Sequence, residues 1–125
     1  MFINISNHPS ARWSKEQKEA AEQYGVVKDL TFPNIHPTLT SKNINELVNS
    51  IIGDVLTLTN EFPEDNILTV MVQGEFIFTF RLVTELKKAG IKTVAAKTER
   101  RVIEKVEDGI TKSISEFKFA GFMEY

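Results

Sequence analysis

The segment Ile67-Leu68-Thr69-Val70-Met71-Val72-Gln73-Gly74-Glu75 places an almost unbroken run of apolar and β-branched side chains before a short polar stretch. Such a run is typical of a strand that is covered on both faces, as in the middle of a parallel sheet. Apolar residues at helical spacing follow over Phe76–Lys88, and Gly90 suits the position just after a helix end. A buried strand followed directly by a helix favours an α/β fold.

The same alternation of strand and helix occurs near the start of the chain. Residues 2–5 predict a short strand that stops at Asn7-His8-Pro9, because proline cannot donate to the sheet ladder. Ser14 followed three residues later by Gln17 has the form of a capping box, which predicts a helix from there to about Tyr24.

The remaining elements continue the alternation. A second strand is predicted over residues 26–30, a long helix from about Ser41, a turn over residues 62–65 and a further strand over residues 91–96. Gly53 weakens the long helix by about 1 kcal/mol relative to alanine but does not end it.

The end of the chain predicts a hairpin. Asp108-Gly109 is a strong two-residue turn signal, and apolar positions over residues 102–106 and 114–122 flank it. Together these patterns predict one domain over residues 1–125. We expect a three-layer, Rossmann-like α/β fold with a mostly parallel sheet and a C-terminal antiparallel hairpin.

The composition limits the function classes. The chain has 125 residues, 42% hydrophobic and 26% charged, which excludes a disordered protein. Fifteen Lys and Arg against 17 Asp and Glu give a net charge of −2, so we expect no long nucleic acid coating its surface. The absence of cysteine excludes disulfides, thiolate zinc sites and cysteine nucleophiles. No apolar run approaches the roughly 20 residues of a membrane span, and the start lacks signal-peptide features, so we expect a cytoplasmic protein without membrane contact.

Three polar segments are candidates for a ligand site. Ligands of open α/β sheets bind beyond the carboxyl ends of the parallel strands. The segments expected there are residues 6–13, 73–75 and 97–101. The first and third carry arginine, and all three should share one edge of the sheet.

Gly74 opens the predicted helix after the buried strand. Glycine lets a ligand approach the backbone, and a helix N-terminus offers unpaired N–H groups to an anion. A tight strand-to-helix turn explains the same glycine without a ligand. Glu75 likewise has a structural explanation, because a carboxylate in the first turn interacts favourably with the helix dipole.

Arg100 and Arg101 are two of the four arginines in the chain and are adjacent. A guanidinium group matches two phosphate oxygens. The alternative is a cross-strand pairing with Glu104 or Glu116. Side chains alternate along a strand, so one arginine of the two is expected to face the site.

His8 and His36 are the two histidines of the chain. His8 lies in the first polar segment, where it could act as a general acid or base, while a loop-capping role fits either residue. Their spacing matches no metal motif, so we predict no metal and no cofactor. Trp13 could stack on a nucleobase or pack against the sheet. Phenylalanines at positions 76, 78 and 80 could expose one helix face to a partner subunit.

These segments resemble one known family. The Asn-His-Pro loop, Gln73-Gly74-Glu75-Phe76, the stretch from Thr98 to Glu104 and the aromatic final strand ending in Glu124-Tyr125 resemble the small single-domain CRISPR-associated proteins of the Csx type. Those proteins are regarded as relatives of the CARF (CRISPR-associated Rossmann fold) sensor domains. The resemblance runs in order from Asn4 to Tyr125 and is weakest over residues 32–66.

The resemblance implies a homodimer that binds cyclic oligoadenylate, the second messenger of type III CRISPR systems. Some relatives are ring nucleases, which cleave this messenger without a metal. The family's ligand loops would correspond to Asn7-His8-Pro9-Ser10, Gln73-Gly74-Glu75 and Thr98-Glu99-Arg100-Arg101.

The resemblance also suggests a role for each of these residues. Arg100 or Arg101 would hold phosphate, amides near Gly74 would cradle it, and His8 would be the acid or base. Asn7, Ser10 and Gln73 would hydrogen-bond ribose or adenine. A non-catalytic sensor of the same ligand and a generic partner-binding domain are the alternatives.

Overall fold

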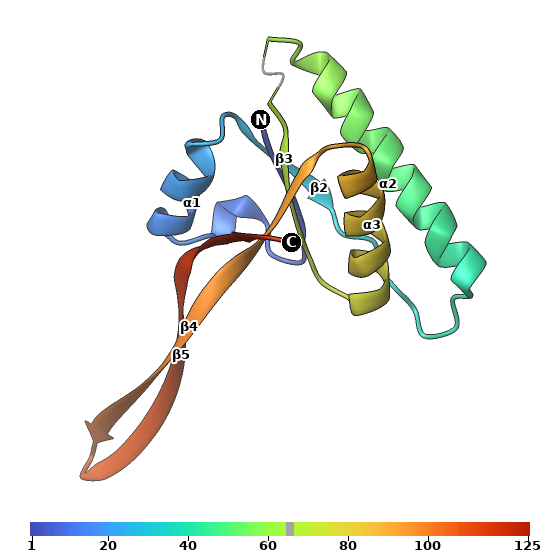
Figure 1. Ribbon diagram of the computed structural model, residues 1–125. Coiled ribbons are helices and arrows are strands. Elements are labelled where there is room, and N and C mark those ends of the chain that lie inside the picture. Colours follow the sequence, from blue (N-terminus) through green and yellow to red (C-terminus); the bar gives the residue numbers. More distant parts are fainter. Residues whose placement is uncertain (65–66) are drawn as a thin grey trace.

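The computed structural model describes residues 1–64 and 67–125, so the last residue of the turn predicted over residues 62–65 lies outside the described part (Figure 1). Helices and strands alternate as the sequence predicts. In chain order the elements are β1 (Phe2–Ser6), a short 3-10 helix η1 (Ser10–Arg12), α1 (Lys15–Glu22), β2 (Val27–Thr31), α2 (Ser41–Glu61), β3 (Thr69–Gln73), α3 (Phe76–Lys88), β4 (Lys92–Glu107) and β5 (Ile110–Glu124).

The strands form one five-stranded sheet with the order β2-β1-β3-β4-β5. Strands β1 to β4 pair in parallel, and β5 is antiparallel to β4. This arrangement confirms the predicted α/β class, with a mostly parallel sheet and a C-terminal antiparallel hairpin. None of the helices in the described residues is long and apolar enough to cross a membrane.

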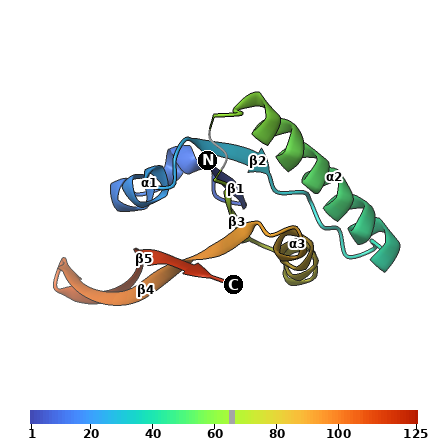
Figure 2. The ribbon, with the colours of Figure 1, turned by 45° about the horizontal axis from the view of Figure 1, so that its top comes forward.

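The sheet lies between two layers of helices. Alternate residues of β1 point to opposite faces, so Ile3 and Ile5 join the core under α2 and α3, while Phe2 joins a smaller core under α1. Figure 2 shows α1 on one side of the sheet and α2 and α3 on the other. All five residues of β1 are buried, and three of them, Phe2, Ile3 and Ile5, are apolar.

The helix starts follow local capping chemistry. The Ser14 hydroxyl accepts from the backbone N–H of Gln17 at 3.2 Å, as predicted for the first residue before α1. Thr40 and Asn43 form a full capping box at the start of α2, which the sequence analysis did not identify. Helix α2 continues through Gly53, and α3 has the bounds predicted for it.

The C-terminal ribbon differs from the prediction in one important respect. Residues 97–101 form no loop, because β4 is a single strand of 16 residues that includes them. Their polarity reflects exposure on both faces of a two-stranded ribbon, and β5 supplies ladder partners for residues 98–101, such as Lys118 for Glu99. A bulge between Ala96 and Thr98 marks where the ribbon leaves the sheet.

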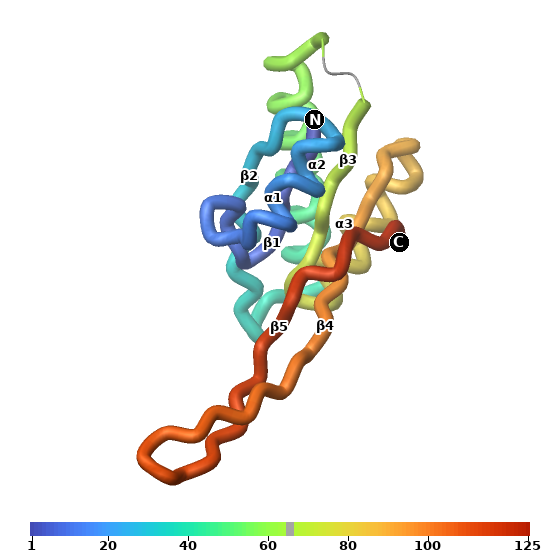
Figure 3. The backbone as a smooth tube through the Cα atoms, turned by 90° about the vertical axis from the view of Figure 1, so that its left-hand side faces the viewer, coloured from blue at the N-terminus to red at the C-terminus, as the bar shows by residue number. Residues whose placement is uncertain are grey.

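The ribbon projects beyond the rest of the domain (Figure 3). Its turn is the predicted Asp108-Gly109, and both residues adopt positive φ angles, of 50° and 75°. At the other end the Tyr125 hydroxyl donates to the Val72 carbonyl oxygen at 2.6 Å, and burial raises the pKa of this hydroxyl. The final strand is therefore tied to the centre of the sheet.

Candidate functional site

The strand order creates a switch point between β1 and β3. The chain leaves β1 for β2 on one side and returns to β3 on the other, so the connections diverge at the carboxyl ends of this neighbouring pair. Crevices of this kind hold the ligands of open α/β sheets. Ser6 and Gln73 end the two strands and face each other in register.

A groove of about 660 Å³ opens at this switch point. Such a volume is typical of small-molecule sites, which span roughly 300–1,000 Å³. Its floor consists of strand residues, one wall belongs to the segment from the β1 loop into α1, and the other wall belongs to the ribbon. The lining includes His8, Arg12 and Trp13 on the first wall, Gln73 on the floor, and Thr98, Arg101, Phe117, Lys118 and Phe119 on the ribbon.

The groove gathers three cationic side chains. Arg12, Arg101 and Lys118 line it, opposed by the carboxylates of Glu16 and Glu116. Among the described residues Arg12 and Lys118 form no ion pair, so both can receive an anion. Arg101 contacts Glu99 at 3.6 Å, but this pair is exposed and is worth at most about 1 kcal/mol.

A buried hydrogen-bond network fixes the first wall. The Asn4 side chain is 1% exposed, and its amide donates to the His8 carbonyl oxygen at 2.9 Å and to Asp29 Oδ1 at 2.8 Å. Asp29 in turn accepts from the Ser10 hydroxyl at 2.8 Å. The Trp13 indole N–H donates to the same His8 carbonyl at 3.0 Å. The loop that carries His8 is therefore held by the sheet.

Sequence reasoning missed the role of Asn4 in this network. A buried amide in the middle of an otherwise apolar strand is the signal that could have identified it, because buried polar groups need partners. Arg12 and Lys118 were also missed as groove residues. Arg12 lies in a segment that the sequence placed near the site, whereas Lys118 lies in the second arm of the predicted hairpin. Only the fold brings both residues to one groove.

We expect Asn4→Ala to lower the free energy of unfolding by about 1–2 kcal/mol, because it removes three hydrogen bonds at a buried position, including the one that Asn4 Oδ1 accepts from the Ser6 hydroxyl at 2.7 Å. Urea denaturation measures the change. Asn7→Ala is the matched control: Asn7 is exposed and lies on the same loop, so its loss should change stability by less than about 0.5 kcal/mol. Equal effects of the two substitutions would contradict this role for Asn4.

Four of the predicted site residues meet at the groove. They are His8, Gln73, Thr98 and Arg101. The Gln73 side chain accepts from the Ala96 backbone N–H at 3.1 Å, which leaves its amide N–H₂ group available to a ligand.

The other predicted residues take different positions. Arg100 does not line the groove and donates to the Ser115 hydroxyl at 3.1 Å, so one arginine of the adjacent pair faces the site. Glu99 contacts Arg101, and Ser10 is bonded to Asp29. Asn7 lines two smaller cavities next to Phe32 rather than the main groove.

Gly74 and Glu75 are occupied by the fold itself. The Glu75 carboxylate caps α3, accepting from the backbone N–H groups of Ile77 at 3.0 Å and Phe78 at 2.7 Å. The space beside the Gly74 Cα is filled by the ring of Phe32. Both residues thus serve the strand-to-helix turn, as the structural alternatives proposed.

The remaining candidates are also accounted for. His36 Nδ1 accepts from the Thr38 backbone N–H at 3.2 Å, so this histidine caps its own turn. Trp13 is 7% exposed, and its ring packs edge-on against Phe2 at 6.1 Å between centroids. Over residues 1–64 and 67–125, no three His, Asp or Glu side chains gather into a set that could hold a metal ion.

Comparison with known proteins identifies one family. A family model described as "Uncharacterized protein MJ1673 family" matches residues 1–123, which is nearly the whole chain. No curated protein and no solved structure matches the chain. The family description names no activity.

Proposed function

The chain belongs to the MJ1673 family, and from the geometry of its groove we propose that it binds cyclic oligoadenylate, the second messenger of type III CRISPR systems, and cleaves it without a metal. The observation that carries this proposal is the convergence of Arg12, Arg101 and Lys118 with the half-buried ring of Phe119 in one groove at the switch point. Cations suit phosphates, and an aromatic ring in the groove suits a nucleobase.

The groove fits a compact anion better than a long one. Its three cations and two carboxylates leave one net positive charge in a protein of net charge −2, so attraction for an anion is local to this site. Phe119 lines the groove and is half-buried, and a base stacked on such a ring is worth about 1–3 kcal/mol. A ring of several adenylates exceeds one groove, so the proposal includes a homodimer whose two grooves share the ligand. The proposed function also places the protein in the cytoplasm.

The proposed reaction is an internal transesterification. The ribose 2′-oxygen attacks the adjacent phosphorus in line as the bond from phosphorus to the 5′-oxygen breaks, leaving a 2′,3′-cyclic phosphate and a 5′-hydroxyl. The 2′-hydroxyl loses a proton and the 5′-oxygen gains one, so no other reactant is consumed. Arg101 and Arg12 would stabilise phosphate charge, and His8 would transfer a proton.

The test is to incubate the protein with cyclic tetra-adenylate and cyclic hexa-adenylate and to resolve the products by chromatography. We expect linear products with a 2′,3′-cyclic phosphate, formed equally well in EDTA. An intact ring that is nonetheless bound would favour the non-catalytic sensor. Neither binding nor cleavage would overturn the proposal and leave a partner-binding domain.

A substitution of His8 separates chemistry from binding. We expect His8→Ala to slow cleavage by about 10²-fold or more while binding changes little, because general acid–base catalysis contributes about 10²–10⁴-fold. The loop should remain in place, since its contacts to Asn4 and Trp13 use the backbone carbonyl of His8 rather than its ring. Single-turnover assays measure the rate. Equal loss of binding and cleavage would instead make His8 a binding residue.

A further inference from the structure

The ribbon of β4 and β5 leaves a row of apolar side chains uncovered. Val102 is 62% exposed, Val106 71% and Phe117 70%, and this part of the ribbon extends away from the sheet (Figure 1). A two-stranded ribbon on its own is marginally stable at best in water. The ribbon therefore gains from a partner that covers one of its faces.

One face can be assigned from the strand register. Arg100 donates to the Ser115 hydroxyl, and Ser115 pairs with Val102, so these residues point to the same side. Side chains alternate along each strand, which extends this side in both directions. The "valine face" consists of Arg100, Val102, Glu104 and Val106 on β4 and of Thr111, Ser113, Ser115 and Phe117 on β5.

The valine face carries opposite charges on either side of Val102. Arg100 and Glu104 are four residues apart, or about 13 Å along a strand, so they do not reach each other. Glu104 has no ion pair among the described residues, and Arg100 bonds to a neutral hydroxyl. Arg100 and Glu104 can therefore each form an ion pair with a residue of another molecule.

A second copy of the chain supplies both partners at once. In this arrangement two ribbons stack with their valine faces together, and a two-fold axis runs between them at Val102, perpendicular to the strands. This symmetry places Arg100 against the partner's Glu104, and Glu104 against the partner's Arg100. The same operation sets the large Phe117 over the partner's small Ser113. Such self-complementarity is what a two-fold interface requires.

The opposite face of the ribbon lacks this property. Lys105 and Lys112 pair directly across the two strands there. A two-fold axis at Ile103 would place Glu116 against the partner's Lys112, which is attractive. It would also place Arg101 against the partner's Lys105 and Glu99 against the partner's Glu107, and both of these contacts are repulsive. The charge pattern thus selects the valine face.

We propose that the valine face is the surface through which two copies of this chain associate. This inference deepens the homodimer of the proposed function, but it stands on the ribbon alone and needs no ligand. In this arrangement the partner's Val106 lies over Thr98, which lines the groove. The second copy therefore closes the ribbon end of each groove.

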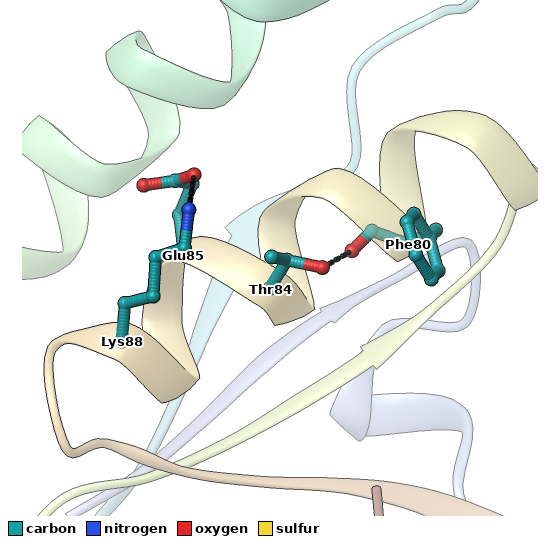
Figure 4. Close-up of polar contacts among 4 residues, drawn as sticks. All are labelled: Phe80, Thr84, Glu85 and Lys88. Carbon is teal, nitrogen blue, oxygen red and sulfur yellow. Dashed lines mark hydrogen bonds and ion pairs between the residues drawn. The ribbon is translucent and has the colours of Figure 1, made fainter.

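Helix α3 presents a competing apolar surface. Phe78 is buried, whereas Phe76 is 88% exposed and Phe80 73%. Figure 4 shows that the polar groups beside Phe80 are paired within the helix: Thr84 Oγ1 donates to the Phe80 carbonyl oxygen at 2.7 Å, and Lys88 contacts Glu85 at 3.3 Å. These internal pairs leave no charge pattern that selects an occupant.

The test is a charge exchange followed by sedimentation velocity without ligand. We expect the natural protein to be a dimer at micromolar concentration. Arg100→Glu and Glu104→Arg should each weaken the dimer by at least about tenfold, because each places like charges together twice. The double variant R100E/E104R should restore it. Lys105→Glu, on the opposite face, is the control that should leave the dimer unchanged.

Three results would overturn the inference. They are a natural protein that remains monomeric, a dimer that survives Arg100→Glu, and a double variant that fails to recover while its thermal unfolding matches the natural protein. If Phe80→Asp dissociates the dimer and the charge exchanges do not, α3 is the interface instead. Cleavage assays are independent of these measurements, so failure of the interface and failure of the proposed function are distinguishable.

Discussion

Gly74→Ala is expected to lower the free energy of unfolding by about 1–3 kcal/mol, although it adds a single methyl group. A Cβ at this position would lie 2.9 Å from Phe32 Cε1 and closer still to two other atoms of the same ring. Phe32 cannot yield freely, because it is 9% exposed and packs against Phe78 with 5.1 Å between ring centroids. Urea denaturation at fixed pH measures the change.

Gly53→Ala provides the matched control for this experiment. Nothing lies within 4 Å of a Cβ at Gly53, which is inside α2, so the same substitution should stabilise the protein by about 0.5–1 kcal/mol. Phe32→Leu should also recover part of the loss when combined with Gly74→Ala, since the smaller side chain makes room. A destabilisation of similar size at both glycines would contradict the steric explanation.

The periodic parts of the sequence predicted most of the fold. The buried run that ends in β3 and the helical spacing of α3 identified the α/β class, because a strand covered on both faces occurs in few other architectures. Local chemistry was equally informative at Ser14 and at Asp108-Gly109, where capping and turn residues act within a few positions. These signals are local and need no tertiary information.

The site was harder to predict, because its composition depends on tertiary contacts. Polar residues over 97–101 resemble a loop, yet they continue β4, since a two-stranded ribbon has both faces in water. Lys118 reaches the groove only through the pairing of β5 with β4, and the bulge sets which side chains face inward. Sequence spacing correctly predicted that one arginine of the adjacent pair faces the site, but it could not identify which.

Arg101→Glu is expected to weaken the binding of cyclic tetra-adenylate by about 100-fold. Arg101 lines the groove, so its guanidinium can form charge-assisted hydrogen bonds with phosphate, each worth about 1.5–3 kcal/mol. Reversal adds a repulsive charge near Glu116 on the same wall. Trp13 is the single tryptophan and also lines the groove, so its fluorescence reports binding in titrations at fixed salt.

Lys105→Glu separates a local contact from the overall field of the protein. It changes the net charge by the same amount as Arg101→Glu and lies on the same ribbon, but outside the groove. Long-range attraction is screened beyond about 8 Å at physiological salt, so the control should weaken binding by less than about threefold. The two variants should also differ in salt dependence, because a lost phosphate contact reduces the salt dependence of binding. If both variants weaken binding equally, the ligand responds to net charge alone and Arg101 is not a phosphate contact.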